Sequence, residues 1–112
     1  MQKNFPKFIF ISFLFISFHF SFADTIIQTN EKQALIDMYD SLDGENWSSC
    51  KWKKEIFSKD LVICKLCGII CENPFSNIIS LNLRENNLKG ILPSSIGNLI
   101  YLQSLDLSIN KM

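Results

Sequence analysis

Residues 78–88 read IISLNLRENNL, and residues 102–112 read LQSLDLSINKM, 24 positions further along the chain. Both lines follow the pattern L-x-x-L-x-L-x-x-N-x-L, with another apolar residue wherever leucine is not used. A helix needs apolar spacings near 3.6 residues, and the glycines and the proline between the two lines would interrupt one. A pattern that recurs at a fixed period is instead typical of a repeat architecture.

Each line predicts a short strand followed by a turn. Leu81 and Leu83 lie two residues apart, so they project from one face of a strand and leave the polar residues beside them on the other face. Asn86 follows where the chain must turn inward, and its carboxamide can both accept and donate hydrogen bonds. Asn110 holds the same place in the second line. Stacked units would place these two asparagines in a ladder that pairs the buried backbone of the turns.

The residues between the two lines resemble a known family. Residues 88–99 read LKGILPSSIGNL, which resembles the plant-type leucine-rich repeat L-x-G-x-I-P-x-x-I-G-x-L, with Leu92 where the family usually has isoleucine. Ile96 and Leu99 are three residues apart, so one short helical turn can point both of them inward. The resemblance implies leucine-rich repeats over residues 78–112, one complete and one truncated.

The first 23 residues predict a secretory signal peptide. Two lysines precede a largely apolar run at 8–18, and the small residues Ser21 and Ala23 stand at −3 and −1 before a predicted cleavage site between Ala23 and Asp24. The alternative is an uncleaved anchor, which would need roughly 20 apolar residues to span a membrane. Cleavage would remove His19, the one histidine of the sequence.

The next segment predicts one helix and one modification site. Asn30 opens a capping-box-like start, with Gln33 three residues later, and apolar residues then recur at helical spacing. We expect a helix from about Glu31 to Ser41, ended by Asp43-Gly44. Asn46-Trp47-Ser48 is an N-glycosylation sequon, which a secreted glycoprotein can use at Asn46.

This helix, a cysteine box and a first repeat together resemble the N-terminal cap of plant-type leucine-rich repeat ectodomains, and similar caps occur in repeat proteins of protists. The resemblance covers about residues 31–112. It implies three parts: a signal peptide at 1–23, a cap with helix and cysteine box at 24–77, and leucine-rich repeats at 78–112. The expected fold class is α/β, a leucine-rich repeat solenoid fragment with an N-terminal helical, disulfide-bonded cap.

The cysteine box departs from the family pattern. The family cap carries C-x-W-x-G-V-x-C, whereas residues 64–71 read CKLCGIIC, with leucine in place of tryptophan and one extra cysteine. Alternatively, Cys50 begins the box, and residues 53–66 are an insertion. Four cysteines allow three pairings. The pairing that the resemblance favours is Cys64–Cys71 with Cys50–Cys67.

Two other interpretations of the cysteines are disfavoured. Cys64 and Cys67 have the C-x-x-C spacing of a redox pair, but no thioredoxin-like βαβ pattern surrounds them. Four thiolates could bind zinc, but the spacing of the cysteines and an oxidising, secreted setting argue against a metal. Structural disulfides suit a small secreted domain with a thin core.

The composition favours a binding module over an enzyme. Eleven basic residues balance eleven acidic ones, so the sequence offers no basic patch for nucleic acid. The mature chain would have no histidine, and we find no phosphate loop or nucleophile elbow, so we expect no catalytic residues and no cofactor. In repeat solenoids the strands line a concave surface that meets partners. The residues that this pattern places on the concave face are Ser80, Asn82, Arg84, Glu85, Ser104, Asp106 and Ser108.

Arg84 has a second interpretation. It stands beside Asp106 of the next predicted strand, so the two could simply pair with each other at little energetic value.

Two functions fit these expectations. The first is the N-terminal part of a secreted or cell-surface leucine-rich repeat receptor-like protein that binds a protein or peptide. Relatives of this type continue to a membrane span and often a kinase, so membrane association would depend on sequence missing from this chain. The second is a soluble secreted inhibitor or decoy of the polygalacturonase-inhibitor type. Either function places the chain outside the cell or at the extracellular face of the plasma membrane.

The second repeat is expected to leave an open edge. Leu105 and Leu107 have no following repeat to cover them, and about three repeats are needed for stability. We therefore expect the N-terminal piece of a longer ectodomain or a truncated product, which is marginally stable or self-associates through this edge.

Overall fold

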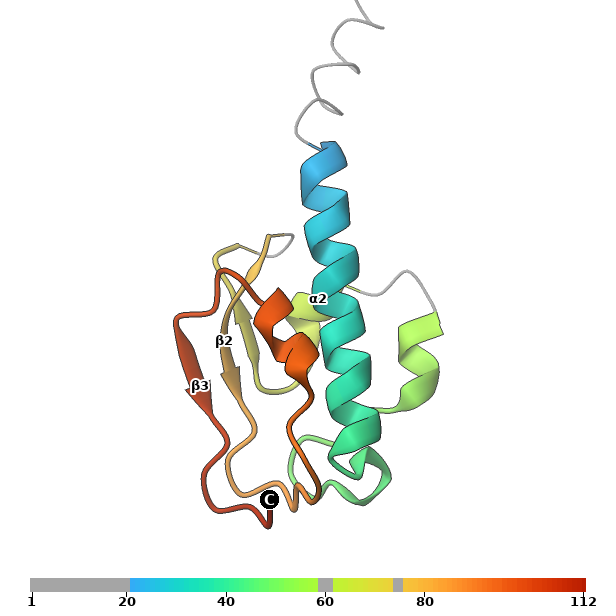
Figure 1. Cartoon of the computed structure of the whole chain (residues 1–112), viewed down its shortest axis with the longest axis vertical. Coiled ribbons are helices and arrows are strands. Elements are labelled where there is room, and N and C mark those ends of the chain that lie inside the picture. Colours follow the sequence, from blue (N-terminus) through green and yellow to red (C-terminus); the bar gives the residue numbers. More distant parts are fainter. Residues whose placement is uncertain (1–20, 59–61, 74–75) are drawn as a thin grey trace, which may run out of the picture.

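The computed structural model of the chain describes residues 21–58, 62–73 and 76–112. The predicted signal peptide at 1–23 lies almost wholly outside these ranges and stays a prediction. Figure 1 shows a long helix standing beside the strands. In chain order the elements are α2 (Ser21–Ser41), the 3₁₀ helices η1 (Gly44–Asn46), η2 (Lys54–Ser58) and η3 (Ile63–Lys65), the strands β1 (Ile69–Cys71) and β2 (Ile78–Asn82), the 3₁₀ helix η4 (Ser94–Asn98), and the strand β3 (Ser104–Asp106).

The chain is already helical at Ser21, the first described residue, ten positions before the predicted start at Glu31. The predicted capping-box start is therefore wrong, and Asn30 is an interior helical residue. Neither proline nor glycine occurs in Ser21–Ser41, and an interior asparagine costs a helix well under 1 kcal/mol relative to alanine, so the sequence offers no strong break. The helix ends at Ser41, as the Asp43-Gly44 signal predicts.

From Glu31 onward, α2 buries one face. The buried positions recur at spacings of three and four residues, which places them along one side of a helix. They join residues of β2 in a single hydrophobic core between the helix and the sheet. The fully buried apolar side chains of this core are Ala34, Leu35, Met38 and Leu42 from the helix and its end, and Ile78, Leu81, Leu83 and Leu88 from the first repeat.

Four aromatic side chains extend the core at the carboxyl end of α2. Tyr39, Trp47, Trp52 and Phe57 are all buried, and their rings meet at tilted or edge-to-face angles with centroids 5.0–6.4 Å apart. Both indole N–H groups are satisfied: Trp47 donates to the carbonyl of Leu42 at 2.8 Å and Trp52 donates to that of Cys67 at 2.9 Å. The cluster therefore anchors the segment around residues 47–57 without burying an unpaired donor.

The sheet has the strand order β1-β2-β3. Strand β1 pairs antiparallel with β2, and β2 pairs parallel with β3, with Leu81 opposite Leu105. The two lines of the sequence thus lie side by side, in register, at their 24-residue offset. Strand β1 is not foreseen from the sequence, because three residues are too few to show an alternating pattern. The described residues form a small mixed domain of helices and strands, and its two parallel strands are too few to constitute a solenoid.

The loop between the two parallel strands is pressed against α2. Gly90 has φ +129°, and a Cβ at this position would collide with the backbone carbonyl of Ser41. The amide of Lys89 donates to the carbonyl of Leu42 at 3.2 Å, which fixes the loop at the end of the helix. The chain then turns back through η4, in which Ile96 is half-buried, and Leu99, directly after η4, is buried, so the predicted inward-facing turn is present.

Candidate ligand-binding face

Two disulfides hold the segment that precedes the strands. Cys50 is bonded to Cys67, and Cys64 is bonded to Cys71. This is the pairing that the resemblance favours. All four cysteines are bonded as disulfides, so none is a thiol or thiolate in this structure. Cys64 and Cys67, the candidate redox pair, are each bonded to another cysteine and not to each other. Zinc would need thiolates, and all four sulfurs are held in disulfides.

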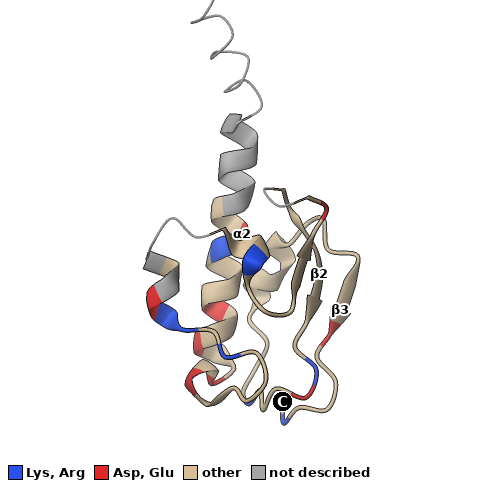
Figure 2. Cartoon of the chain, turned by 180° about the vertical axis from the view of Figure 1, so that it is seen from behind, with Lys and Arg blue, Asp and Glu red and all other residues tan. Residues whose placement is uncertain are grey.

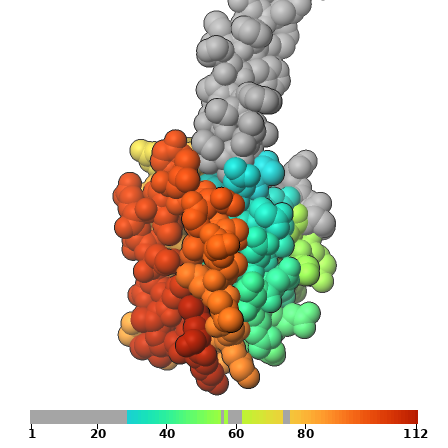
Figure 3. Space-filling view, in the orientation of Figure 1, coloured from blue at the N-terminus to red at the C-terminus, as the bar shows by residue number. Residues whose placement is uncertain are grey.

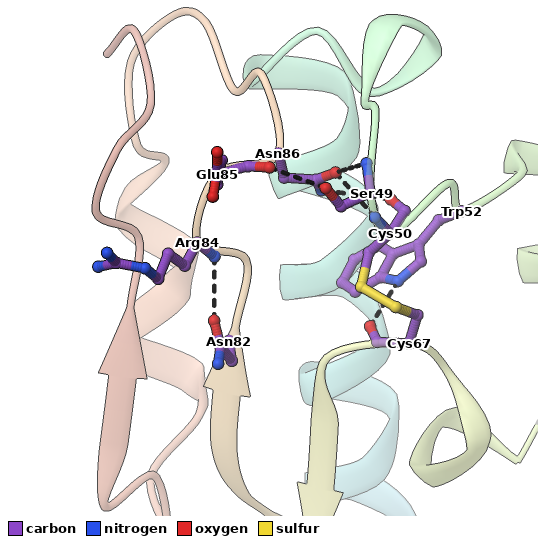
Figure 4. Close-up of a disulfide and its surroundings, with 8 residues drawn as sticks. All are labelled: Ser49, Cys50, Trp52, Cys67, Asn82, Arg84, Glu85 and Asn86. Atoms are coloured by element: carbon purple, nitrogen blue, oxygen red, sulfur yellow. Dashed lines mark hydrogen bonds between the residues drawn. A yellow bond between two sulfur atoms is a disulfide. The ribbon is translucent and has the colours of Figure 1, made fainter.

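The Asn86 side chain joins the first repeat to this disulfide-bonded segment by hydrogen bonds (Figure 4). Its side chain is fully buried, and its Oδ1 accepts the backbone N–H groups of Ser49 at 2.6 Å and Cys50 at 2.8 Å. Its Nδ2 donates to the carbonyl of Cys50 at 3.2 Å. One side chain therefore satisfies three backbone groups of a different segment, which would be costly to bury unpaired.

Asn110 makes the equivalent contacts one repeat later. Its Oδ1 accepts the backbone N–H groups of Asn86 and Leu88, each at 2.9 Å, and its Nδ2 donates to the carbonyls of Leu83 and Leu107, each at 2.9 Å. Each asparagine thus pairs the backbone of the unit that precedes it. The two form a continuous ladder from the disulfide-bonded segment to the second repeat.

The two strands end in the same way. The side-chain oxygen of Asn82 accepts the backbone N–H of Arg84 at 3.0 Å, and that of Asp106 accepts the backbone N–H of Ser108 at 3.0 Å. These turns, in which a side chain bonds the backbone two residues on, hold both side chains back against their own chain. Asn82 and Asp106 are therefore preset in orientation on the face that the sequence predicts to meet a partner.

Arg84 reaches across to the second repeat through a hydroxyl group. Its Nη1 donates to Oγ of Ser108 at 2.7 Å, and that hydroxyl donates to Oδ1 of Asp106 at 2.5 Å. The hydrogen bonds from the Ser108 hydroxyl and N–H, and more weakly the positive charge of Arg84, lower the pKa of Asp106 below its ordinary value of 3.8. The second interpretation of Arg84 is a direct pair with Asp106. In the structure the two side chains are linked through the hydroxyl group of Ser108 instead.

The seven predicted face residues come from equivalent places in the two repeats. Ser80 lies opposite Ser104, and Asn82 lies opposite Asp106, across the parallel pair. Five of the seven are exposed, and Ser80 and Asp106 are half-buried. The structure therefore gathers a polar, hydrogen-bonding surface on β2, β3 and the turns that follow them.

Ile109, which the repeat pattern does not place on the concave face, lies directly after Ser108 at the edge of this surface. Ile109 has φ 55°, its counterpart Glu85 in the first repeat has φ 52°, and the Ile109 side chain is 58% exposed. A branched side chain is rare in this left-handed conformation. The sequence does mark Ile109 in one way: it directly precedes Asn110, whereas the equivalent residue before Asn86 is the polar Glu85.

The sequon residue Asn46 is exposed at the end of η1. Its Nδ2 donates to both carboxylate oxygens of Asp43, each at 3.0 Å, and its carbonyl accepts a hydrogen bond from Nδ2 of Asn87 at 2.9 Å. The position is open to solvent, and its glycosylation stays a prediction.

The remaining surface is of mixed charge. Figure 2 shows positive and negative residues interspersed along α2 and η2. An exposed ion pair between Lys54 and Asp40, at 2.9 Å, joins these two helices. Over residues 21–58, 62–73 and 76–112, we find no cluster of side chains suited to a metal ion. Within the same part of the chain, none of the helices is long and apolar enough to cross a membrane.

The chain is similar to plant receptor-like kinases. It is 36% identical over 115 residues to a probable inactive receptor kinase of Arabidopsis thaliana, covering 95% of this chain and 18% of that protein. It is 38% identical over 78 residues to a probable leucine-rich repeat receptor-like protein kinase of the same plant, covering 70% of this chain and 7% of the relative. It is 34% identical over 73 residues to the Arabidopsis leucine-rich repeat receptor-like protein kinase TDR, covering 64% of this chain and 7% of the relative.

No protein-family profile matches the chain. The similarities support the plant leucine-rich repeat receptor-like family, and the chain spans less than a fifth of the length of these relatives. Receptor-like relatives and two disulfides are both consistent with a protein that works outside the cell.

Proposed function

We propose that the chain is a protein- or peptide-binding part of a plant-type leucine-rich repeat receptor-like ectodomain, secreted or displayed at the extracellular face of the plasma membrane. In this proposal α2 and the two disulfides are the cap, and residues 78–112 are the opening repeats of a solenoid. The chain itself carries no catalysis. Any kinase activity of a full-length protein would belong to sequence other than these 112 residues.

One observation carries the proposal: polar residues of the two repeats align across a parallel strand pair. Ser80 with Ser104 and Asn82 with Asp106 lie in register, and the backbone bonds of Asn82 and Asp106 restrict their rotamers before any ligand arrives. A preset polar surface loses less conformational entropy on binding than a mobile one. The Arg84–Ser108–Asp106 bridge adds a positively charged donor, a hydroxyl group and a negatively charged acceptor to the same surface.

The chemistry of this face suits an extended, polar peptide segment. Hydroxyl, carboxamide, guanidinium and carboxylate groups recur every second residue along the strands, which matches the spacing of side chains on an extended partner. The relatives reported above are receptor-like kinases, and no observation favours the inhibitor alternative.

The test uses the secreted chain, immobilised and panned with a library of random dodecapeptides. Peptides that are enriched should lose at least tenfold in affinity when Ser104→Lys or Arg84→Glu is introduced, because both changes alter the shared face. Lys89→Ala, a charge change at an exposed residue of the loop that contacts α2, is the matched control and should leave affinity unchanged. Enriched peptides that ignore both face variants would contradict the proposal.

A further inference from the structure

Strand β1 places one isoleucine on the same face of the sheet as the polar residues of β2 and β3. Ile69 pairs with Leu81, and both side chains are buried, 7% and 0% exposed. The next residue, Ile70, pairs with Ser80 and is 58% exposed. Because successive side chains of a strand point to opposite faces and directly paired residues point to the same face, Ile70 lies on the face of Ser80. Ser80 in turn pairs with Ser104, so Ile70, Ser80 and Ser104 form one row across the three strands.

The opposite face of the sheet is covered by the chain itself. Ile96 of η4 packs against the hydrophobic core, to which Ile69 and residues of α2 also belong. In Figure 3, η4 (orange) lies directly against α2 (cyan to green). Ile70 therefore points away from this core, toward the face on which the proposed function places a ligand.

A hollow adjoins Ile70. It has a volume of about 500 Å³ and is formed by residues of η3 and β1 and by the two residues that follow β1. Its apolar walls include Ile70 and the Cys64–Cys71 disulfide. Lys65 and Glu72 also line it, and their opposite charges cancel. Ligand sites of roughly 300–1,000 Å³ with mostly apolar walls and few polar groups hold apolar groups, so this hollow suits an uncharged, apolar side chain.

The walls of the hollow are fixed before any ligand binds. The Cys64–Cys71 disulfide joins η3 to the end of β1. The amide of Ile69 donates to the carbonyl of Leu66 at 3.1 Å, which holds the turn between η3 and β1. A site that is already formed loses little conformational entropy on binding.

We propose that Ile70 and this hollow bind an apolar side chain of the peptide that the polar face binds. The inference rests on the proposed function and narrows the class of ligand to a peptide with a leucine-, isoleucine- or phenylalanine-type residue beside its polar segment. Ile70 is then a specificity-determining residue. A polar side chain placed against Ile70 and the disulfide would lose its water without gaining a hydrogen bond from them.

The row across the strands predicts where the apolar residue stands in the peptide. Neighbouring strands are about 4.8 Å apart, so Ile70 and Ser104, two strands apart, are separated by roughly 10 Å. An extended peptide spans this distance in about three residues. A peptide that runs across β1, β2 and β3 should therefore carry its apolar residue about three positions from the residue that contacts Ser104.

A double-mutant cycle between the chain and the peptide tests the inference. Peptides are selected on the secreted chain, and those that lose affinity for Arg84→Glu are kept, because they use the polar face. Replacing the apolar residues of such a peptide by serine, one at a time, should reveal one whose loss lowers the affinity at least tenfold. Ile70→Ser should cause a similar loss. The two changes together should cost little more than either alone, because they remove the same contact.

The cycle has a matched control and separable outcomes. Ile91 is 82% exposed and lies in the loop between β2 and η4, outside this row, so Ile91→Ser should leave affinity unchanged. Circular dichroism and the absence of free thiols verify that each variant is folded. Peptides that depend on Arg84 but not on Ile70 would overturn this inference and leave the proposed function standing. A library without binders, or binders that ignore both Arg84→Glu and Ser104→Lys, would count against both.

Photo-cross-linking places the apolar residue on the unmodified chain. A selected peptide carries a diazirine analogue of leucine at its apolar position and is irradiated in the complex. Mass spectrometry should locate the cross-link within residues 64–73, whereas the same analogue three positions away should label residues 104–108. Cross-links from the apolar position to α2 or to residues 104–112 would overturn the inference.

Discussion

At the scale of single residues, Asn86 contributes more to the fold than its size suggests. It is fully buried, and the three hydrogen bonds of its side chain all reach the Ser49–Cys50 backbone, 36 and 37 positions away in the chain. Asn110 in turn binds the backbone of Asn86 itself. The cap and the two repeats are therefore joined by side-chain amides as well as by apolar packing.

Replacement of Asn86 should be strongly destabilising. Asn86→Ala leaves two N–H donors and a carbonyl without their partner, and we expect a loss of about 3 kcal/mol in the free energy of unfolding. Asn86→Asp keeps the acceptor oxygen but buries a negative charge and sets its second oxygen against the carbonyl of Cys50, so it should also be strongly destabilising. Urea denaturation monitored by tryptophan fluorescence gives both values, with Asn98→Ala, a change at an exposed residue of η4, as the control. An Asn86→Ala variant as stable as that control would contradict the ladder.

Ile109 should be a site where a substitution stabilises the chain. Its φ of 55° is unfavourable for a branched side chain, and asparagine adopts this conformation more readily. Ile109→Asn should therefore raise the free energy of unfolding by about 1 kcal/mol, measured at concentrations where the chain is monomeric. Ile91→Asn, at an exposed isoleucine that is not among the positive-φ residues, should bring no gain. Equal effects at both positions would show that backbone strain is not the cause.

At the scale of elements, the contact between α2 and β2 depends on a buried carboxylate. Glu31 is fully buried in α2, and its Oε2 accepts the backbone N–H of Ile78 at 3.0 Å where β2 begins. Its Oε1 faces Nδ2 of Asn77 at 3.5 Å. Burial raises the pKa of Glu31 above 4.5, and these two hydrogen bonds offset part of the rise.

This raised pKa fixes the sign of a pH dependence. The folded state binds the Glu31 proton more tightly than the unfolded state does. Protonation of Glu31 therefore adds to the free energy of unfolding, fully below pH 4.5, and this contribution is lost as pH rises through the folded-state pKa. Glu31→Gln keeps an oxygen for the Ile78 amide and removes the titration. The stability of the unmodified chain relative to Glu31→Gln should fall as pH rises above about 4.5, as measured by urea denaturation across pH 4–8. A relative stability that rises over this range would be the opposite of the expected result.

Gly90 tests how tightly the repeat loop lies against the helix. Gly90→Ala adds a Cβ that collides with the carbonyl of Ser41 at a positive φ, so we expect a loss of about 2 kcal/mol or more. Gly97→Ala is a matched control, because a Cβ at Gly97 has no atom within 4 Å. Thermal denaturation of the two variants should separate them clearly, and similar melting temperatures would exclude close packing of the loop.

The elements also show what the sequence could predict. Strands β2 and β3 are foreseeable because one apolar pattern occurs twice, and the end of α2 is marked by Asp43-Gly44. The start of α2 is not foreseeable, because Asn30 looks like a cap although the segment before it has no proline or glycine to stop the helix. Strand β1 and the position of Trp52 depend on pairing with distant residues, such as Gly68 with Asn82, and leave no periodic trace in the sequence.

At the scale of the whole molecule, disulfides cross-link one side of the chain, and the other side exposes apolar residues. Two disulfides and the aromatic cluster hold the segment next to α2 and β1. Strand β3 and the turn after it leave apolar residues exposed. The polar face spans β2 and β3 between these two sides. The face residues follow from the repeat pattern, but the bridge from Arg84 through Ser108 depends on side-chain rotamers that spacing alone does not determine.

Amide chemical-shift mapping of the isotopically labelled chain, titrated with a peptide selected against it, locates the ligand-binding surface residue by residue. We predict that the perturbed amides cluster at residues 80–86 and 104–110, on both parallel strands at once. Perturbations confined to α2 or to the charged segment around Lys51–Glu55 would contradict the assignment of the binding face.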